Sequence, residues 1–169
     1  MRRATIGTAA LLAGTAILAG TSVWWWQHES DLESQRAGAK DRMEAATRAG
    51  ARAVPVFGDL SVSTAQADLA RSATVLTKDF AAQYEPALAK SAAGLSAHRA
   101  TIVEEVTAAA PVDISADGDE VHVLVYFTEH ATFADGTPSS DQSIQYVLTM
   151  KHEGGSWLVD AADPPSQSS

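Results

Sequence analysis

The sequence predicts an α+β protein in which helices cover one face of a curved, antiparallel four-stranded sheet. Three observations support this fold class: helical patterns come first along the chain, strand patterns follow, and Asp-Gly or Gly-Gly pairs separate the strands. Short turns between successive strands favour an antiparallel meander. The chain has 169 residues, which is enough for one domain with its own core and an additional N-terminal segment.

The N-terminal segment, residues 4–26, has the length and composition of a single transmembrane helix. It contains no ionisable side chain, and about 23 helical residues at about 1.5 Å each exceed a hydrocarbon core of about 30 Å. Basic residues precede the segment and acidic residues follow it, so residues 1–3 are expected to form a cytoplasmic tail and the C-terminal domain is expected outside the cell membrane. The expected anchor residues in the lipid bilayer are Ile6, Leu11, Leu12, Ile17, Leu18, Val23, Trp24, Trp25 and Trp26.

A cleaved secretory leader is the alternative for this segment. Small residues from Ala16 to Gly20 would suit cleavage near Ala19. However, the chain has no cysteine that could carry a lipid, and cleavage before Trp24 would leave three tryptophans at a new N-terminus. These observations favour a retained anchor.

Residues 27–55 are predicted to form a juxtamembrane helical stalk. The segment is rich in Ala, Glu, Lys and Arg, and Glu44 and Arg48 lie one helical turn apart. Its apolar stripe is thin, which favours a solvated stalk over a partner-binding helix. Gly50 and Pro55 are expected to end the helix.

The globular domain is expected at residues 56–163 and begins with two helices. Ser63 and Gln66 have the spacing of a capping box, which predicts a first helix that extends to Val75. Residues 164–169 are polar and are expected to form a disordered tail.

The second helix carries a regular apolar pattern. Phe80, Tyr84 and Leu88 recur at four-residue spacing, which places them on one helical face. Pro86 fits a kink or a restart of this helix, and Gly94 is expected to end it.

The period then changes to two, which predicts strands. The clearest alternation has valines and Phe127 on one face, with His122, Leu124 and Tyr126 on the other. The expected strands are residues 102–114, 121–128, 144–150 and 156–160, and the turns are Asp117-Gly118, Asp135-Gly136 and Gly154-Gly155.

Charge and composition exclude several classes of function. The formal net charge is −9, and Lys151 is the only Lys or Arg after residue 100, so binding to nucleic acid is not expected. The absence of cysteine excludes disulfides, thiolate nucleophiles and cysteine-based zinc sites. No metal or other cofactor is expected.

Two stretches give the chain a resemblance to a known family. They are FGDLSVSTAQADLARSATVLTKDFAAQYE, with Phe80 and Tyr84, and GGSWLVDAADP, with Trp157. Together with the anchor, the stalk and the meander, they resemble the actinobacterial Mce-associated membrane proteins. The resemblance implies an NTF2-like (cystatin-like) outer domain and an accessory role in lipid-importing Mce complexes of the cell envelope. It implies Mce transporter subunits as partners, and neither a catalytic residue nor a cofactor.

An enzyme is the rival reading, because NTF2-like domains also host isomerases and dehydratases. Candidate residues are Asp79, His98, His122, Tyr126 and His130. The last two histidines lie about 26 Å apart along an extended strand, so they are not expected to share a substrate atom or a metal ion. No nucleophile, zinc or phosphate-binding motif accompanies them, and the prediction is that the protein is not an enzyme.

A third reading is a lipid- or sterol-binding pocket. Its lining would consist of Phe80, Tyr84, Leu88, Tyr126 and Trp157, although the same aromatic residues could simply fill the core. The sequence favours a non-enzymatic, membrane-anchored scaffold of an envelope assembly, with lipid binding as the alternative.

Overall fold

The protein consists of an N-terminal helix followed by a compact α+β domain. The computed structural model describes the backbone of residues 9–134 and 138–164, and the side chains of residues 34–90, 93, 99–134 and 138–164. The chain divides into two compact units, residues 1–40 and residues 41–169. The elements are α1 (Ala9–Gly58), β1 (Leu60–Ser61), α2 (Ala65–Ser72), α3 (Lys78–His98), β2 (Ala100–Ile114), β3 (Glu120–Phe133), β4 (Ser140–Glu153) and β5 (Ser156–Asp163).

The side chains of the predicted membrane anchor lie outside the described part of the chain. Helix α1 begins at Ala9, but the side chains of residues 1–33 are not described. Among the residues whose side chains are described, no helix is long and apolar enough to cross a membrane. The anchor at residues 4–26 therefore stays a prediction, as does the disordered tail, because residues 165–169 are not described.

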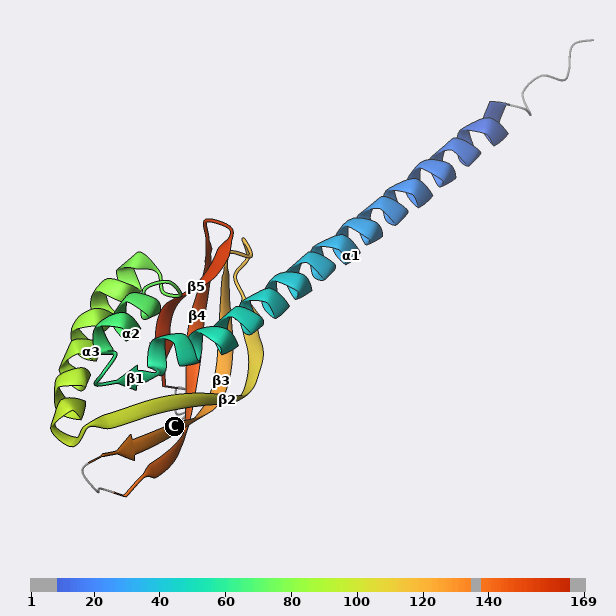
Figure 1. Ribbon diagram of the computed structural model, residues 1–169. Helices are drawn as coiled ribbons and strands as arrows, with labels where there is room; N and C mark the ends of the chain where they lie inside the picture. The colour runs from blue at the N-terminus through green and yellow to red at the C-terminus, as the bar shows by residue number, and fades with distance from the viewer. Residues whose placement is uncertain (1–8, 135–137, 165–169) are drawn as a thin grey trace, which may run out of the picture. The chain divides into compact units, whose positions relative to one another are not determined.

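The sheet has five strands and not the four that the sequence predicted. Its order is β1-β2-β3-β4-β5, and every neighbouring pair is antiparallel (Figure 1). The additional strand, β1, has two residues that pair with Thr101 and Ile102 of β2. The four long strands follow the predicted meander, and each extends beyond the predicted residues by two to seven positions.

Two predicted turns are confirmed by backbone conformation. Gly118, after β2, and Gly154 and Gly155, between β4 and β5, all have positive φ. Glycine adopts this conformation without steric cost, which explains its place in tight turns. The predicted Asp135-Gly136 turn lies in residues 135–137, outside the described chain.

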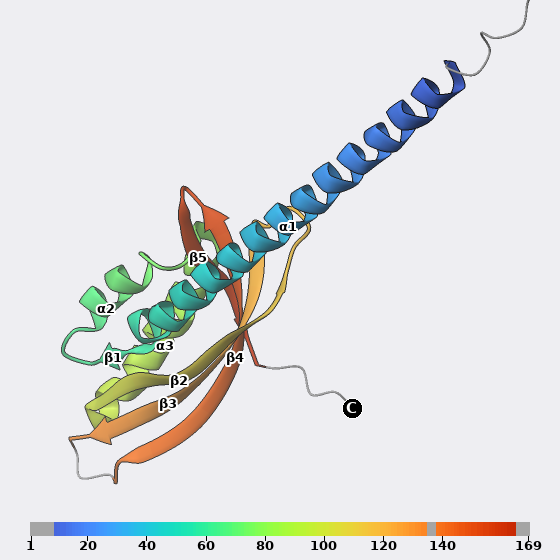
Figure 2. The same ribbon diagram turned by 90° about the vertical axis from the view of Figure 1, so that its right-hand side faces the viewer.

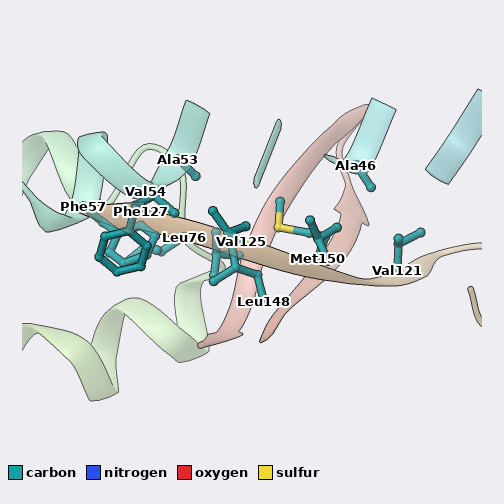
Figure 3. Close-up of a cluster of buried hydrophobic side chains, with 12 residues drawn as sticks. Ala46, Ala53, Val54, Phe57, Leu76, Val121, Val125, Phe127, Leu148 and Met150 are labelled. Carbon is teal, nitrogen blue, oxygen red and sulfur yellow. The ribbon is translucent and has the colours of Figure 1, made fainter. Parts of the chain in front are cut away.

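The last part of α1 belongs to the core of the domain, which corrects the prediction of a solvated stalk up to residue 55. Ala46, Ala53, Val54 and Phe57 are buried, and Figure 3 shows them facing side chains of the sheet. Their spacing of three, four and seven residues places them on one helical face. The stripe was underestimated because alanine contributes little apolar area.

Neither Gly50 nor Pro55 ends α1, which continues to Gly58. A Cβ at Gly50 would lie 3.3 Å from side-chain atoms of Leu148 and Met150, so Gly50 marks a close approach of helix and sheet. Pro55 stands in the last turn, where it removes a single intrahelical hydrogen bond. Burial of the neighbouring Val54 and Phe57 compensates for that loss.

Helices α2 and α3 lie side by side next to β1 (Figures 1 and 2). The predicted capping box is wrong, because the N-cap of α2 is Thr64 and it makes no side-chain cap bond. Helix α3 runs through Pro86 and Gly94 to His98, and Arg99, with φ 48°, marks its end. The N-terminus of α3 is capped by Thr77, whose hydroxyl accepts a hydrogen bond from the Phe80 amide at 3.3 Å.

One face of β3 forms the centre of the core. Val121, Val123, Val125 and Phe127 are at most 1% exposed, as the alternation predicted. They pack with Leu148, Met150 and Val159 of the neighbouring strands. The opposite face carries Tyr126, which is 44% exposed.

Candidate functional site

The structure brings together three of the five residues of the predicted pocket. Phe80, Tyr84 and Leu88 come from one face of α3. The Tyr84 ring stands edge-on to Phe57, at a centroid distance of 5.7 Å, and lies 5.8 Å from Phe80. The Tyr84 hydroxyl donates a hydrogen bond to the Phe57 carbonyl at 2.9 Å, and burial raises the pKa of Tyr84 to about 12. These rings therefore join α3 to the end of α1.

The other two residues lie elsewhere. Tyr126 is on the outer face of β3, away from the valines of the core. Trp157 of β5 is partly buried, and its ring lies 5.1 Å from that of His152 of β4 at an interplanar angle of 52°. An aromatic-lined pocket built from all five residues is therefore not present.

Two hollows form instead between α2 and α3. One, of about 260 Å³, is lined by residues that include Leu69, Ala73 and Tyr84. The other, of about 270 Å³, is lined by residues that include Leu60, Leu69 and Leu88. Gln66 and Leu69 line both hollows, whose walls are mainly apolar; the two hollows together are here called the α2–α3 groove.

A buried carboxyl group, which the sequence analysis did not single out, lies on the inner face of the sheet. Glu104 of β2 follows Ile102 and precedes Val106 on that face, and its Oε2 atom is buried without a hydrogen-bond partner among the described residues. A Cβ at Gly58 would collide with this carboxyl group, so the end of α1 lies directly against it.

Burial and neighbouring acids change the protonation of Glu104. Burial, followed by the charges of Glu129 and Asp59, raises the pKa of Glu104 to about 8. Glu129 stands directly opposite in the β2–β3 register, and the Asp59 carboxylate accepts a hydrogen bond from the Glu104 amide at 2.7 Å. Burial also raises the pKa of Tyr146 on β4. Glu104 is thus largely protonated at neutral pH.

The sequence contained a signal for this residue. In the predicted strand 102–114, Ile102, Glu104 and Val106 share one face by the period of two. A carboxyl group between two apolar residues on a core-facing side predicts a shifted pKa. The adjacent Glu105 obscured this signal, because the pair Glu104-Glu105 puts one acid on each face.

The residues proposed for an enzyme do not converge. His122 pairs with Asp113, whereas His130 lies 2.9 Å from an Asp141 carboxylate oxygen. This hydrogen bond with Asp141 is the main reason why the pKa of His130 is raised. Asp79 is exposed in the first turn of α3, and the side chain of His98 is not described. Within the described residues, no group of three potential ligands could hold a metal ion.

Comparisons with known proteins identify the fold. No protein-family model and no curated protein sequence matches the chain. A periplasmic fragment of TraM matches in structure, with a TM-score of 0.58 at 14% identity over 71% of this chain and 94% of the fragment. An IcmL-like type IV secretion system protein from Legionella pneumophila matches with a TM-score of 0.59 at 13% identity over 73% and 93% of the two chains.

The periplasmic domain of DotI is similar as well, with a TM-score of 0.60 at 13% identity over 72% of this chain and 94% of that domain. At this level of identity the likeness concerns the fold, and it does not extend specifically to the Mce-associated proteins. The chain therefore contains an α+β domain with the fold seen in these three structures.

Proposed function

We propose that this protein is a membrane-anchored, non-enzymatic scaffold whose α+β domain works on the outer side of the cell membrane. The observation that carries the proposal is the likeness to the domains of TraM, DotI and the IcmL-like protein, because 93–94% of each of those chains is matched. All three come from proteins of the cell envelope or of a secretion system, according to their descriptions. The predicted anchor would hold the domain close to its partners and raise their effective concentration.

The arrangement of polar groups supports a scaffold over an enzyme. The candidate histidines pair with carboxylates on exposed strands, and the protonated Glu104 lines neither hollow of the α2–α3 groove. A catalytic acid must reach its substrate within hydrogen-bond distance. The groove and the carboxyl group are thus separate features.

The finer proposal is that the assembly is an Mce-type lipid importer. It is supported by the sequence resemblance of the Phe57–Glu85 and Gly154–Pro164 stretches. A secretion-type complex is the competing assembly, and the two are distinguished by their subunits.

Chemical crosslinking in intact cells tests the proposal. The full chain, with an affinity tag after residue 169, is crosslinked, purified, and its neighbours are identified by mass spectrometry. We expect membrane-complex subunits among the neighbours, and Mce transporter subunits in particular for the finer proposal. Recovery of the chain without any membrane protein would overturn the scaffold function. Release of the chain by alkaline carbonate would contradict the anchor.

Lipid binding is the second candidate function, and the α2–α3 groove favours it. Each hollow is close to the lower limit of about 300 Å³ for ligand pockets and has mainly apolar walls. Native mass spectrometry of the full chain, released from detergent, would show a bound lipid. The variant Ala73→Trp, at an exposed position on the wall of the groove, should lose that lipid, whereas Ala82→Trp, an exposed alanine of α3 outside the groove lining, should retain it.

A further inference from the structure

One edge of the sheet is left open over most of its length. Strand β1 pairs only with Thr101 and Ile102, and Asp59 binds the amide of Glu104. Residues 105–114 of β2, here called the open β2 edge, pair on one side with β3 and on the other side with no described residue. At about 3.3 Å per residue this edge is about 33 Å long.

The opposite edge of the sheet is covered at its middle. The Thr77 amide donates to the Val159 carbonyl at 2.8 Å, and the Val159 amide donates to the Val75 carbonyl at 2.9 Å. This segment before α3 therefore covers the middle of β5. Proteins commonly cover or interrupt exposed edges, because unpaired backbone groups can bind another strand. The open β2 edge has no such cover among the described residues.

Apart from Glu105 and Asp113, the side chains along the open β2 edge are small or apolar. Residues 107–110 are Thr-Ala-Ala-Ala, which leaves the backbone accessible. Among the described side chains, the large hydrophobic ones that remain exposed are Val103 at 46%, Val112 at 54% and Tyr126 at 44%. The first two belong to β2, and Tyr126 pairs with Ala108 across β2 and β3. Exposed apolar groups thus gather on and beside this strand.

The charge of this region favours one kind of partner strand. Strand β2 carries Glu104, Glu105 and Asp113 and no basic residue, and Lys151 is the only Lys or Arg after residue 100. A second copy would bring one acidic edge against another, and like charges on adjacent strands are destabilising. An extended segment with Lys or Arg residues complements the edge in both backbone pairing and charge.

We propose that the open β2 edge binds an extended, basic segment of a partner protein as an additional strand. The inference rests on the scaffold function and names the chemical class of segment that the scaffold would hold. The strand would lie beside residues 107–110, between the register shift at Val106/Ala108 and Pro111. That shift and the missing N–H of Pro111 interrupt longer pairing, which also hinders association of identical copies.

A photo-crosslinking amino acid at Ala110, which is exposed on the edge, tests the inference in intact cells with the full chain. Glu153, exposed at the β4–β5 turn, is the matched control position. We expect a crosslink from position 110, and not from 153, to a segment rich in Lys or Arg within a membrane-complex subunit. Crosslinks to a second copy, to lipid, or to nothing would overturn the inference. If chemical crosslinking still recovers membrane-complex subunits, only the strand-docking inference fails and the scaffold function stands.

Two variants separate backbone pairing from charge. Pro111 has no N–H to donate to β3, so its backbone position faces the open side. Pairing with β3 is regular from Ala108 to Pro111, and residues two apart on a strand direct their backbone groups to the same side. The Ala109 amide therefore faces the open side as well. Ala109→Pro should therefore abolish the crosslink. Glu105→Lys should lower its yield about tenfold, whereas Glu153→Lys should leave it unchanged. Unchanged yield in both edge variants, with native circular dichroism, would refute the docking mode.

Discussion

Replacement of Glu104 by glutamine should stabilise the domain at neutral and alkaline pH. The glutamine keeps the shape of the protonated acid and cannot ionise. Glu104 has a buried oxygen without a partner, and the acids Asp59 and Glu129 raise its pKa together with burial. Burial, followed by the charge of Glu104, raises the pKa values of Tyr84 and Tyr146, so both phenols stay neutral.

The direction of the pH dependence follows from proton binding. The pKa of Glu104 is about 8 in the folded protein, against an ordinary value of 4.5, so the folded state holds this proton more tightly than the unfolded state. Well below the ordinary pKa of Glu104, the unfolding free energy does not depend on this group. It falls as the pH rises from the ordinary pKa to the pKa of the folded protein, and it levels off above the latter. At about 1.4 kcal/mol per pKa unit, the loss between about pH 5 and about pH 7 is about 3 kcal/mol.

Urea denaturation of the full chain in mild detergent, followed by near-ultraviolet circular dichroism, measures this loss. The unfolding free energy of the wild type should fall by about 3 kcal/mol between about pH 5 and about pH 7, and that of Glu104→Gln by less than about 1 kcal/mol. Glu105→Gln is the matched control, because it removes the same charge from an exposed neighbour and should follow wild type. His130 also titrates in all three proteins, and its main partner, Asp141, is unchanged in each of them; only Glu105→Gln removes the smaller contribution of Glu105 to the raised pKa of His130. If the unfolding free energies of wild type and Glu104→Gln changed with pH in parallel, the assignment of a buried, protonated carboxyl group would be refuted.

Three further changes test the packing. Tyr84→Phe should cost about 1 kcal/mol of unfolding free energy, because the hydroxyl has a buried carbonyl partner, whereas Tyr126→Phe at an exposed site should cost less than about 0.5 kcal/mol. Gly155→Ala should cost about 1 kcal/mol, because its φ of 83° strains any residue with a Cβ. A fragment of residues 41–169 should fold, and a fragment of residues 56–169 should not, because the latter lacks buried side chains of α1; circular dichroism distinguishes them.

The controls for these changes come from the same chain. Gly38, in the helix and with open space around it, should tolerate alanine and gain up to about 1 kcal/mol of helix stability. Equal unfolding free energies for Gly155→Ala and wild type would contradict the reading of the β4–β5 turn. A folded 56–169 fragment would show that the core does not depend on α1.

The four long strands were predictable because their physical signal is local and repeated. Alternation along residues 121–128 fixed both the strand and the face that Val123 and Val125 turn to the core. The two residues of β1 carry no periodicity, so its pairing could not be foreseen. The end of α1 was misjudged for a different reason. Gly50 interrupts isolated helices, but here it permits close packing on Leu148, a contact that exists only in the folded domain.

The features of the site depend on pairing between distant segments, and the sequence indicates them only in part. The spacing of Tyr84 and Leu88 predicted that they share one helical face, but the α2–α3 groove that they line also needs α2, whose position is set by tertiary contacts. Tyr126 was assigned to the pocket because aromatic residues favour cores, yet the alternation of β3 places it on the opposite face. Where aromatic preference and strand period disagreed, the period decided the position.

One residue links the buried acid to the open β2 edge. Asp59 follows the last residue of α1, and its carboxylate binds the Glu104 amide, where a longer β1 would supply a backbone carbonyl. Backbone pairing by β1 has thus ended at Thr101 and Ile102, and the edge beyond Glu104 is left to other strands. The same carboxylate contributes to the raised pKa of Glu104. A side-chain cap at the end of α1 therefore limits β1 to two residues, keeps a neighbouring acid protonated, and leaves the backbone ladder of β2 accessible to a partner.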